Sequence, residues 1–358
     1  MVRRVMTLVV ALILLAGLGI GSRFLPMPYL VAGPGVTLDT VGRTEDGPVI
    51  EIEGTDSYEH EGSLSMVTVQ YAGGPQHRLD FFTVVRAWLS PTEAVMPEEL
   101  LFPAGRSPEE VSERQTVQMN DSQTDATAAA LNQVGLGYDA VPVVADVVED
   151  MPAQGRVEPG DVITSVDGEE VDIRSEGEPG TAVGSAAVVE RVGDREPGDT
   201  VSLTLDRGGE EVEVELVTEE GEEGRAAVGI LIADEMDFPI GVDITVGDIG
   251  GPSAGMMFAL GIIDRLSEDG LTGGASVAGS GTIDSAGAVG GVSGIPQKMV
   301  SAQRDGAEYF LVAADSCPQI SQSAAYGELE VVRVETLTDA VEALETIRTG
   351  EGDLPRCE

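Results

Sequence analysis

The pattern of hydrophobic and polar residues divides the chain into three parts. Residues 5–21 form an unbroken run without charge, which predicts an apolar helix near the N-terminus. From residue 26 to about 118, short runs with a period of two, such as 49–53 and 64–71, predict strands separated by turns that contain Pro and Gly. After residue 120 the pattern alternates between helical and strand-like segments.

The segments after residue 120 fall into two groups. The first begins with a helix at 121–134, which Asp121 or Ser122 caps and a glycine-containing turn ends. Its other predicted elements are a strand at 143–148, a helix at 185–192, and strands at 200–206 and 211–217. The second group follows a charged linker and contains buried strands at 227–233 and 240–246, a helix beginning at Pro252 and Ser253, and an apolar helix that Lys298 opens.

Length and composition predict several domains in an α+β chain. The 358 residues are 42% hydrophobic, enough for two or three separate cores. The predicted division is an N-terminal transmembrane or signal-anchor helix (1–25), a β-rich segment (26–120), a helix with a small β-rich domain (121–220), a larger α+β domain (225–350) and a tail (351–358).

The charge excludes some partners. The chain has 63 acidic and 20 basic residues, for a net charge of −43. Such a surface repels nucleic acid and anionic lipid headgroups, so neither is an expected partner of the folded part.

The N-terminus has two readings. Residues 5–21 are just long enough for a membrane-spanning helix and slightly longer than the apolar core of most cleaved signal peptides. Both readings leave Arg3 and Arg4 in the cytoplasm and place the rest outside it. We expect a single-pass protein of the cell membrane whose larger part is extracytoplasmic.

The two cysteines, Cys317 and Cys357, are expected to form a disulfide in an exported protein. The bridge would close a loop of about 40 residues and add about 3 to 4 kcal/mol to the stability. With only two Cys and two His, all far apart in the sequence, no metal site is predicted. No cofactor is expected either.

Candidate chemistry centres on Ser253 and Lys298. Lys298 is the only lysine in the chain, and the other basic residues are arginines. A buried lysine can lose its proton and act as a base, whereas an arginine cannot. Ser253 follows Gly251 and Pro252 at the start of a predicted helix, where free amide groups stabilise an oxyanion. This combination predicts a Ser-Lys catalytic pair.

Three other catalytic patterns are excluded. The spacing of Gly251, Ser253 and Gly255 matches the nucleophile turn of α/β-hydrolases, but that fold needs a histidine after the serine. Here His60 and His77 both precede it. A Ser-x-x-Lys motif is absent, and so is a nucleotide-binding Gly-Lys-Ser/Thr loop. The activity is therefore expected to be independent of ATP.

Residues 141–217 resemble bacterial PDZ domains, especially in Pro152-Ala153, Gly160-Asp161-Val162-Ile163 and Val166-Asp167-Gly168. The resemblance implies that Leu136, Gly137 and Tyr138 form the loop that binds a C-terminal carboxylate. It also implies that a peptide adds as a strand beside Val143. The alternative is a PDZ fold that only spaces or gates the neighbouring domain.

Residues 242–313 resemble the proteolytic domain of the Lon (S16) serine proteases. The resemblance rests on Gly251-Pro252-Ser253-Ala254-Gly255, Gly279-Ser280-Gly281-Thr282-Ile283, and Gly287-x-Val289-x-x-Val292-x-Gly294-Ile295-x-x-Lys298. With the PDZ unit and the apolar N-terminus, the chain is similar to the PDZ-containing, Lon-like exported proteases of actinobacteria.

The Lon resemblance implies roles for particular residues. Ser253 is the implied nucleophile, Lys298 the base, and Ser280 stands where the family has a threonine that contacts the lysine. Many members have an acid three residues before the serine, where this chain has Gly250, and Asp248 is the candidate substitute. The family also implies a homo-oligomer and raises the prospect that the PDZ unit is inserted into a discontinuous proteolytic domain.

The predicted function is therefore a membrane-anchored, ATP-independent serine endopeptidase. Its expected partners are peptides, unfolded protein segments and protein C-termini bound by the PDZ domain. The alternative is a membrane-tethered PDZ adaptor with an inactive protease fold, in which replacement of Ser253 changes nothing.

Overall fold

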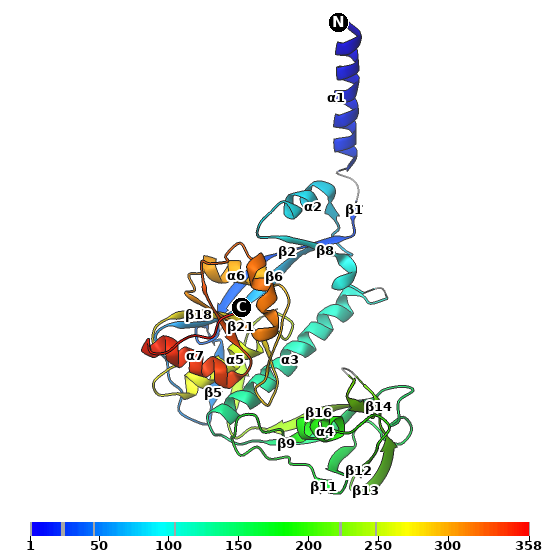
Figure 1. Cartoon of the computed structure of the whole chain (residues 1–358), viewed down its shortest axis with the longest axis vertical. Coiled ribbons are helices and arrows are strands. Elements are labelled where there is room, and N and C mark those ends of the chain that lie inside the picture. The colour runs from blue at the N-terminus through cyan, green and yellow to red at the C-terminus, as the bar shows by residue number, and fades with distance from the viewer. Residues whose placement is uncertain are drawn as a thin grey trace.

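The computed structural model describes residues 2–22, 26–45, 47–103, 105–221, 224–247 and 249–357. Two folded units lie below a projecting N-terminal helix (Figure 1). The α-helices are α1 (Val2–Ser22), α2 (Phe81–Trp88), α3 (Pro108–Gln133), α4 (Gly184–Gly193), α5 (Gly255–Leu266), α6 (Ile295–Arg304) and α7 (Leu337–Thr349). Within the described ranges, 3-10 helices are η1 (Glu98–Leu100) and η3 (Ala314–Gln322).

The larger unit contains a mixed sheet in the order β22-β21-β18-β6-β2-β8. Its strands are β2 (Tyr29–Asp39), β6 (Ser63–Gly73), β8 (Ala94–Pro97), β18 (Ser276–Ser280), β21 (Tyr309–Ala313) and β22 (Glu330–Val334). The strands from β22 to β6 are parallel, and β2 is antiparallel to both β6 and β8. Strands that precede and follow the smaller unit in the sequence therefore share one sheet.

Helices cover both faces of this sheet because its strands carry apolar residues on alternate sides. Val277 and Leu311 belong to one core cluster, which includes residues of α5 and α7. Ala278 and Phe310, each next in sequence to one of these residues, belong to a second cluster with Met299 of α6. Helix α5 is buried along almost its whole length, so its start is held rigidly.

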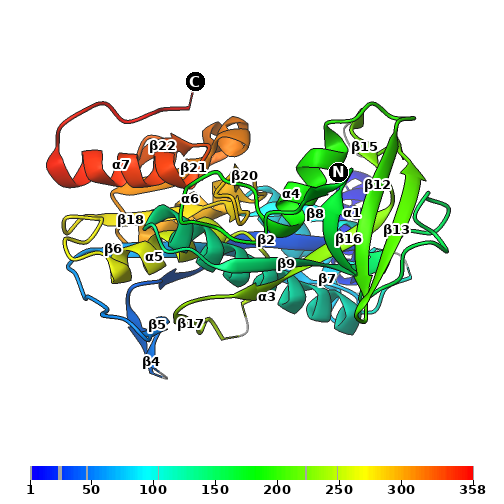
Figure 2. The ribbon, with the colours of Figure 1, turned by 90° about the horizontal axis from the view of Figure 1, so that it is seen from below.

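The smaller unit has the strand order β13-β12-β10-β9-β16, with β11 paired to β10. Its strands are β9 (Asp139–Val147), β10 (Val162–Val166), β11 (Glu169–Glu170), β12 (Thr200–Arg207), β13 (Glu210–Val217) and β16 (Ile230–Asp237). Figure 2 shows β12, β13 and α4 gathered on one side of the molecule and α5, α7 and β18 on the other.

Short strand pairs complete the described part of the chain. They are β1 (Pro26–Met27) with β7 (Leu79–Asp80), β3 (Arg43–Thr44) with β4 (Gly47–Pro48), β5 (Ile50–Glu53) with β17 (Gly241–Ile244), β14 (Glu219–Glu220) with β15 (Ala226–Ala227), and β19 (Thr282–Ile283) with β20 (Val289–Gly290).

Helix α3 begins thirteen residues earlier than the sequence pattern predicts. Ser107 caps it in a capping box with Glu110, and Pro108 occupies the first turn. The predicted caps, Asp121 and Ser122, lie inside the helix. The first half of α3 is polar and shows little helical period, so hydrophobic periodicity alone did not detect it.

The N-terminal helix α1 exposes apolar side chains between Val5 and Leu14. Within the described part of the chain, no helix combines the length and the apolar character that a bilayer crossing requires. The side chains at 15, 16, 18–20 and 22, and residues 23–25, lie outside the described residues. The predicted transmembrane helix at 1–25 thus remains a prediction.

Candidate active site

Ser253 lies in the turn between β17 and α5. Gly251 in this turn has φ +92°, which favours glycine, and its amide donates a hydrogen bond to the carbonyl of Gln115 in α3 at 3.0 Å. The Ser122 hydroxyl, also from α3, donates to the Pro252 carbonyl at 3.2 Å. Helix α5 begins at Gly255 rather than at Pro252, so Ser253 lies just before the helix.

Lys298 is in the first turn of α6. The helix follows Gly294, whose φ of +78° is left-handed, and the Lys298 amide donates to the Gly294 carbonyl at 3.0 Å. A Cβ on Gly294 would lie 2.7 Å from the Val69 side chain of β6. Glycine at this position therefore allows α6 to approach the sheet, and with it Lys298.

The two predicted residues meet in space together with Ser280, the last residue of β18. The Lys298 Nζ lies 2.8 Å from the Ser253 Oγ and 2.8 Å from the Ser280 Oγ. The Ser280 hydroxyl in turn donates to the Ser253 carbonyl at 3.0 Å. Ser280 thus connects the amine to the backbone of the turn that carries Ser253.

The Lys298 amine is in an environment that favours its neutral form. The residue is only 3% exposed, and burial lowers its pKa from 10.5 to about 8. Among the ion pairs of the described residues, none involves Lys298. Desolvation without a compensating carboxylate is the arrangement that prepares a lysine to act as a base.

A cavity of about 680 Å³ opens in front of these residues. Ser253, Lys298 and Pro252 line it together with residues 68–71 of β6. Strand β6 pairs with β18 only from Ser63 to Met66. Residues 68–71 extend beyond that pairing along the cavity.

Asp248, the predicted acidic support, lies outside the described residues. Within the described ranges, no group of three or more His, Cys, Asp or Glu side chains is arranged to hold a metal ion. Cys317 and Cys357 form a disulfide. Both cysteines pack against the apolar cluster that contains residues of β21, so the bridge attaches the C-terminal tail beside β21 and η3.

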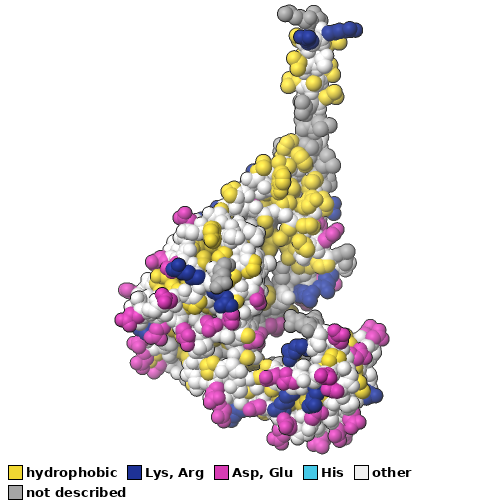
Figure 3. All heavy atoms as spheres, viewed as in Figure 1, with side chains coloured by type: hydrophobic (Ala, Val, Ile, Leu, Met, Phe, Trp, Pro, Cys, Tyr) yellow, Lys and Arg dark blue, Asp and Glu magenta, His cyan; other side chains and the backbone are white. Residues whose placement is uncertain are grey.

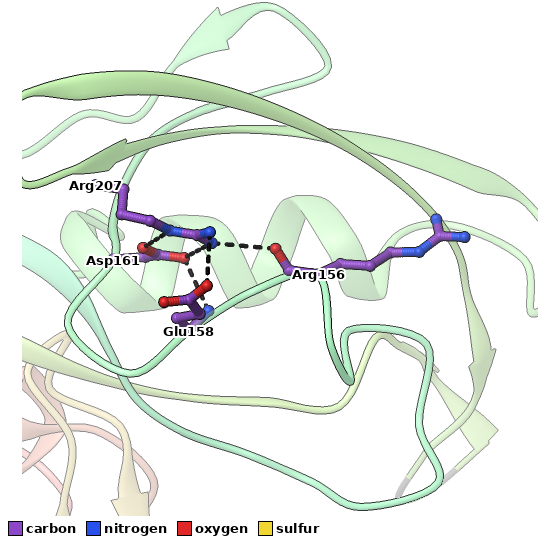
Figure 4. A network of polar contacts seen from close by, with 4 residues as sticks. All are labelled: Arg156, Glu158, Asp161 and Arg207. Atoms are coloured by element: carbon purple, nitrogen blue, oxygen red, sulfur yellow. Dashed lines mark hydrogen bonds and ion pairs between the residues drawn. The ribbon is translucent and has the colours of Figure 1, made fainter.

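The smaller unit contains an ion-pair network between the loop before β10 and the end of β12, with Asp161 buried at its centre (Figure 4). The Asp161 carboxylate accepts two hydrogen bonds from the Arg207 guanidinium, both at 2.7 Å. Arg207 also donates to Glu158 at 2.9 Å and to the Arg156 carbonyl at 3.1 Å. The hydrogen bonds from Arg207 lower the pKa of Asp161 below its usual value. This network fixes the loop before β10.

The family model for the PDZ domain matches residues 115–218, which include this network and strands β9 to β13. The chain contains a PDZ domain. PDZ domains are protein-interaction modules, so this part of the chain serves protein interaction. The remainder of the chain lies outside the matched residues.

Several solved structures match about a quarter of the chain. The PDZ domain of the SdrC-like protein from Listeria monocytogenes is 24% identical, with a TM-score of 0.22, over 26% of this chain and 88% of its own. The corresponding domain from Listeria innocua is 27% identical, with a TM-score of 0.22, over 26% and 93%. A solution structure from Geobacillus thermodenitrificans is 28% identical, with a TM-score of 0.20, over 25% and 92%. No curated protein matches the chain.

The structure corrects the expected position of the peptide in the PDZ domain. Tyr138 is 3% exposed and packs in a cluster with Leu131 of α3, and Leu136 lies against the same cluster. Gly137 faces the Ser175 carbonyl, which leaves no room for a side chain. These residues connect α3 to the PDZ domain and do not form an open carboxylate-binding loop.

Val143 cannot receive a peptide strand because both edges of β9 are occupied there. On one side Val143 pairs with Ala233 of β16, and on the other with Val162 of β10. The outer strand at this end of the sheet is β16 instead. Helix α4 begins beside it, where the Asp234 carboxylate accepts hydrogen bonds from the Ser185 amide and hydroxyl, both at 2.6 Å.

Gly229 marks the point where the chain enters this edge. Val228 and Gly229 are buried and lead directly into β16. Gly229 has φ +79°, and a Cβ there would lie 2.1 Å from the Met151 side chain, so only glycine fits.

Proposed function

We propose that the chain is an ATP-independent serine endopeptidase of the Lon type, with Ser253 as nucleophile and Lys298 as general base. The observation that carries this proposal is the 2.8 Å contact between the Lys298 Nζ and the Ser253 Oγ in a buried environment. Nucleophile and base within hydrogen-bond reach, with a third group orienting the base, is the arrangement that covalent catalysis requires.

In this mechanism the neutral Lys298 amine accepts the Ser253 proton as the Oγ attacks the peptide carbonyl. Amide groups at the start of α5 stabilise the oxyanion of the tetrahedral intermediate. The ammonium then returns the proton to the leaving amine, which gives an acyl-enzyme on Ser253. Lys298 next activates a water molecule, whose attack releases the acid and restores the serine.

Ser280 is proposed to position the amine. Its Oγ accepts from the Lys298 Nζ, while its own proton is donated to the Ser253 carbonyl. The hydroxyl is fully buried, so its direction is fixed. This leaves one lone-pair direction of the neutral amine available for the Ser253 proton.

The shape of the cavity favours an extended peptide as the substrate. The backbone of residues 68–71 borders the cavity beyond the end of β18, so a peptide can add to β6 as a strand. A folded protein does not offer a free strand of this kind. Peptides and unfolded segments are therefore the proposed substrates.

The PDZ domain is proposed to bind protein C-termini at the outer edge of β16. Leu231 on this strand is half-exposed and available to a ligand. Strand β16 continues through β17 to the turn that carries Ser253. The proposed setting is extracytoplasmic, with α1 as the membrane tether, and a homo-oligomer follows only from the Lon resemblance.

The proposal can be tested without a known substrate. Full-length protein is incubated with a small fluorophosphonate, and the adduct is located by mass spectrometry. We expect a single adduct on Ser253, lost in Ser253→Ala and in Lys298→Arg, because arginine does not deprotonate. Ser293→Ala is the matched control, since Ser293 lines the same cavity without contacting Lys298. Equal labelling of wild type and Lys298→Arg, or no labelling of Ser253, would favour the inactive PDZ adaptor.

A further inference from the structure

Helix α2 is apolar on nearly its whole circumference. Its inner face is buried at Val84 and Ala87. Its outer face carries Phe81, Phe82 and Trp88, and Leu89 follows directly after the helix. A soluble surface helix normally has a polar outer face. We call these four outer residues, Phe81, Phe82, Trp88 and Leu89, the aromatic foot.

The aromatic foot is strongly exposed. Trp88 is 74% exposed, Leu89 72% and Phe82 50%. The rings of Phe81 and Phe82 contact each other edge to face, with centroids 5.7 Å apart. Clustered exposed aromatic residues mark an interaction surface, whereas isolated ones do not. Trp88 is moreover the only tryptophan in the chain.

The foot lies where the N-terminal helix joins the folded part. Strand β1 (Pro26–Met27), which follows α1, pairs with β7 (Leu79–Asp80), which immediately precedes α2. Figure 1 shows α1 projecting from the same end of the molecule as α2. Helix α1 itself exposes apolar side chains from Val5 to Leu14. Two apolar surfaces that need the same environment thus meet at one end.

The local charge also differs from that of the whole chain. Residues 72–92 contain two arginines and a single acid, Asp80, in a protein with 63 acidic and 20 basic residues. The Asp80 carboxylate caps α2 by accepting from the amides of Phe82 and Thr83. In Figure 3 apolar side chains gather below α1, and most acidic side chains lie over the other end of the molecule. Both arginines pair with carboxylates just beyond this range, Arg78 with Glu98 and Arg86 with Glu93, so the net charge here is small. An anionic lipid surface therefore repels this end less than the rest of the chain.

We propose that the aromatic foot rests in the headgroup region of a lipid bilayer, as a second membrane contact besides α1. Tryptophan and phenylalanine are the side chains that favour this region. This membrane contact is separate from the proposed protease function. It depends on the proposed tether only because α1 brings the aromatic foot to the membrane.

Trp88 reports directly on this contact. Full-length protein is mixed with vesicles of phosphatidylcholine and phosphatidylglycerol, and its fluorescence is recorded with lipids brominated at different depths. We expect a shift of the emission to shorter wavelength and quenching by bromine close to the headgroups. The double variant Phe82→Ser/Leu89→Ser should lose most of this quenching while still floating with the vesicles through α1. Val217→Ser, which removes an exposed apolar residue from the PDZ domain, should behave as wild type.

Each other outcome has a definite meaning. Flotation with vesicles but an unchanged Trp88 spectrum would contradict the proposed membrane contact of the aromatic foot. It would still agree with α1 as the membrane tether. No flotation would overturn both. A spectral shift that depends on protein concentration in the absence of lipid would show that a second copy covers α2, and would also overturn the proposal. None of these results bears on Ser253 labelling, which tests the protease function separately.

Discussion

The Lys298 Nζ and the Ser253 Oγ lie 2.8 Å apart, although the two residues are 45 positions apart in the sequence. Ser253 lies just before α5, and Lys298 lies in the first turn of α6. Each residue is placed by a glycine-containing turn, and Ser280 holds the amine from a third element. The contact depends on the packing of α5 and α6 against opposite faces of one sheet. Several properties of the chain depend on this contact and on its surroundings.

Ser280→Ala should slow the proposed reaction without abolishing it. The variant removes one acceptor of the Lys298 amine, and the loss of such a hydrogen bond corresponds to about 2 kcal/mol, or roughly thirtyfold in kcat/KM. A hydroxyl that accepts from the ammonium favours the charged form, so its removal should lower the pH midpoint of the rate. Ser280→Thr should restore both. An unchanged midpoint would show that Ser280 has only a structural role.

Lys298→Met should stabilise the fold while it removes activity. Below pH 8 Lys298 is protonated in both the folded and the unfolded protein, so the full burial penalty applies there. Between the folded pKa of about 8 and the unfolded value of 10.5, stability rises with pH as this penalty disappears. At pH 7 the variant should gain up to about 3 kcal/mol in urea unfolding. A less stable Lys298→Met at pH 7 would contradict the desolvated lysine.

Asp125→Asn should stabilise the protein at neutral but not at acidic pH. Burial raises the pKa of Asp125 from 3.8 to about 7, and the nearby carboxylates of Asp284, Asp121 and Asp234 add to the shift. Between these values the folded state holds a proton that the unfolded state has lost, so wild-type stability falls as pH rises from 4 to 7. The gain of the variant should grow over this range to about 4 kcal/mol. A gain independent of pH in denaturant titrations would refute this account.

Arg207→Lys should weaken the PDZ domain although it conserves the charge. The Arg207 guanidinium binds both oxygens of Asp161 at 2.7 Å, a geometry that an ammonium cannot reproduce. We expect the free energy of unfolding of this domain to fall in the variant. Arg191→Lys is a suitable control because Arg191 binds only carbonyl oxygens at the surface. Equal losses in the two variants would contradict a special role of the network.

The contact between Lys298 and Ser253 could be predicted because its signals in the sequence are local. A single lysine in 358 residues draws attention to Lys298, and the glycines beside it and beside Ser253 mark the turns that bring each residue to a helix start. The early half of α3 also had a local signal, the capping box of Ser107 and Glu110 with Pro108 between them. Hydrophobic periodicity does not reveal this half of α3, because a solvated helix segment has no apolar face.

The peptide edge of the PDZ domain could not be predicted in the same way, because strand pairing is not local. Strand β9 pairs along its length with β16, which lies more than eighty residues later in the sequence. That pairing removes the edge beside Val143 and creates a new one on β16. Similarly, β6 and β18 are neighbours although the whole PDZ domain separates them in the sequence.

The most direct test of the central claim is the pKa of the Lys298 amine in the full-length protein. Growth with lysine labelled with ¹³C at Cε gives a single signal, because Lys298 is the only lysine. We predict a titration midpoint near pH 8 in the folded protein and near 10.5 after unfolding in urea. A midpoint near 10.5 in the folded protein would mean that the amine is solvated and charged at neutral pH. Lys298 could then not serve as the base for Ser253.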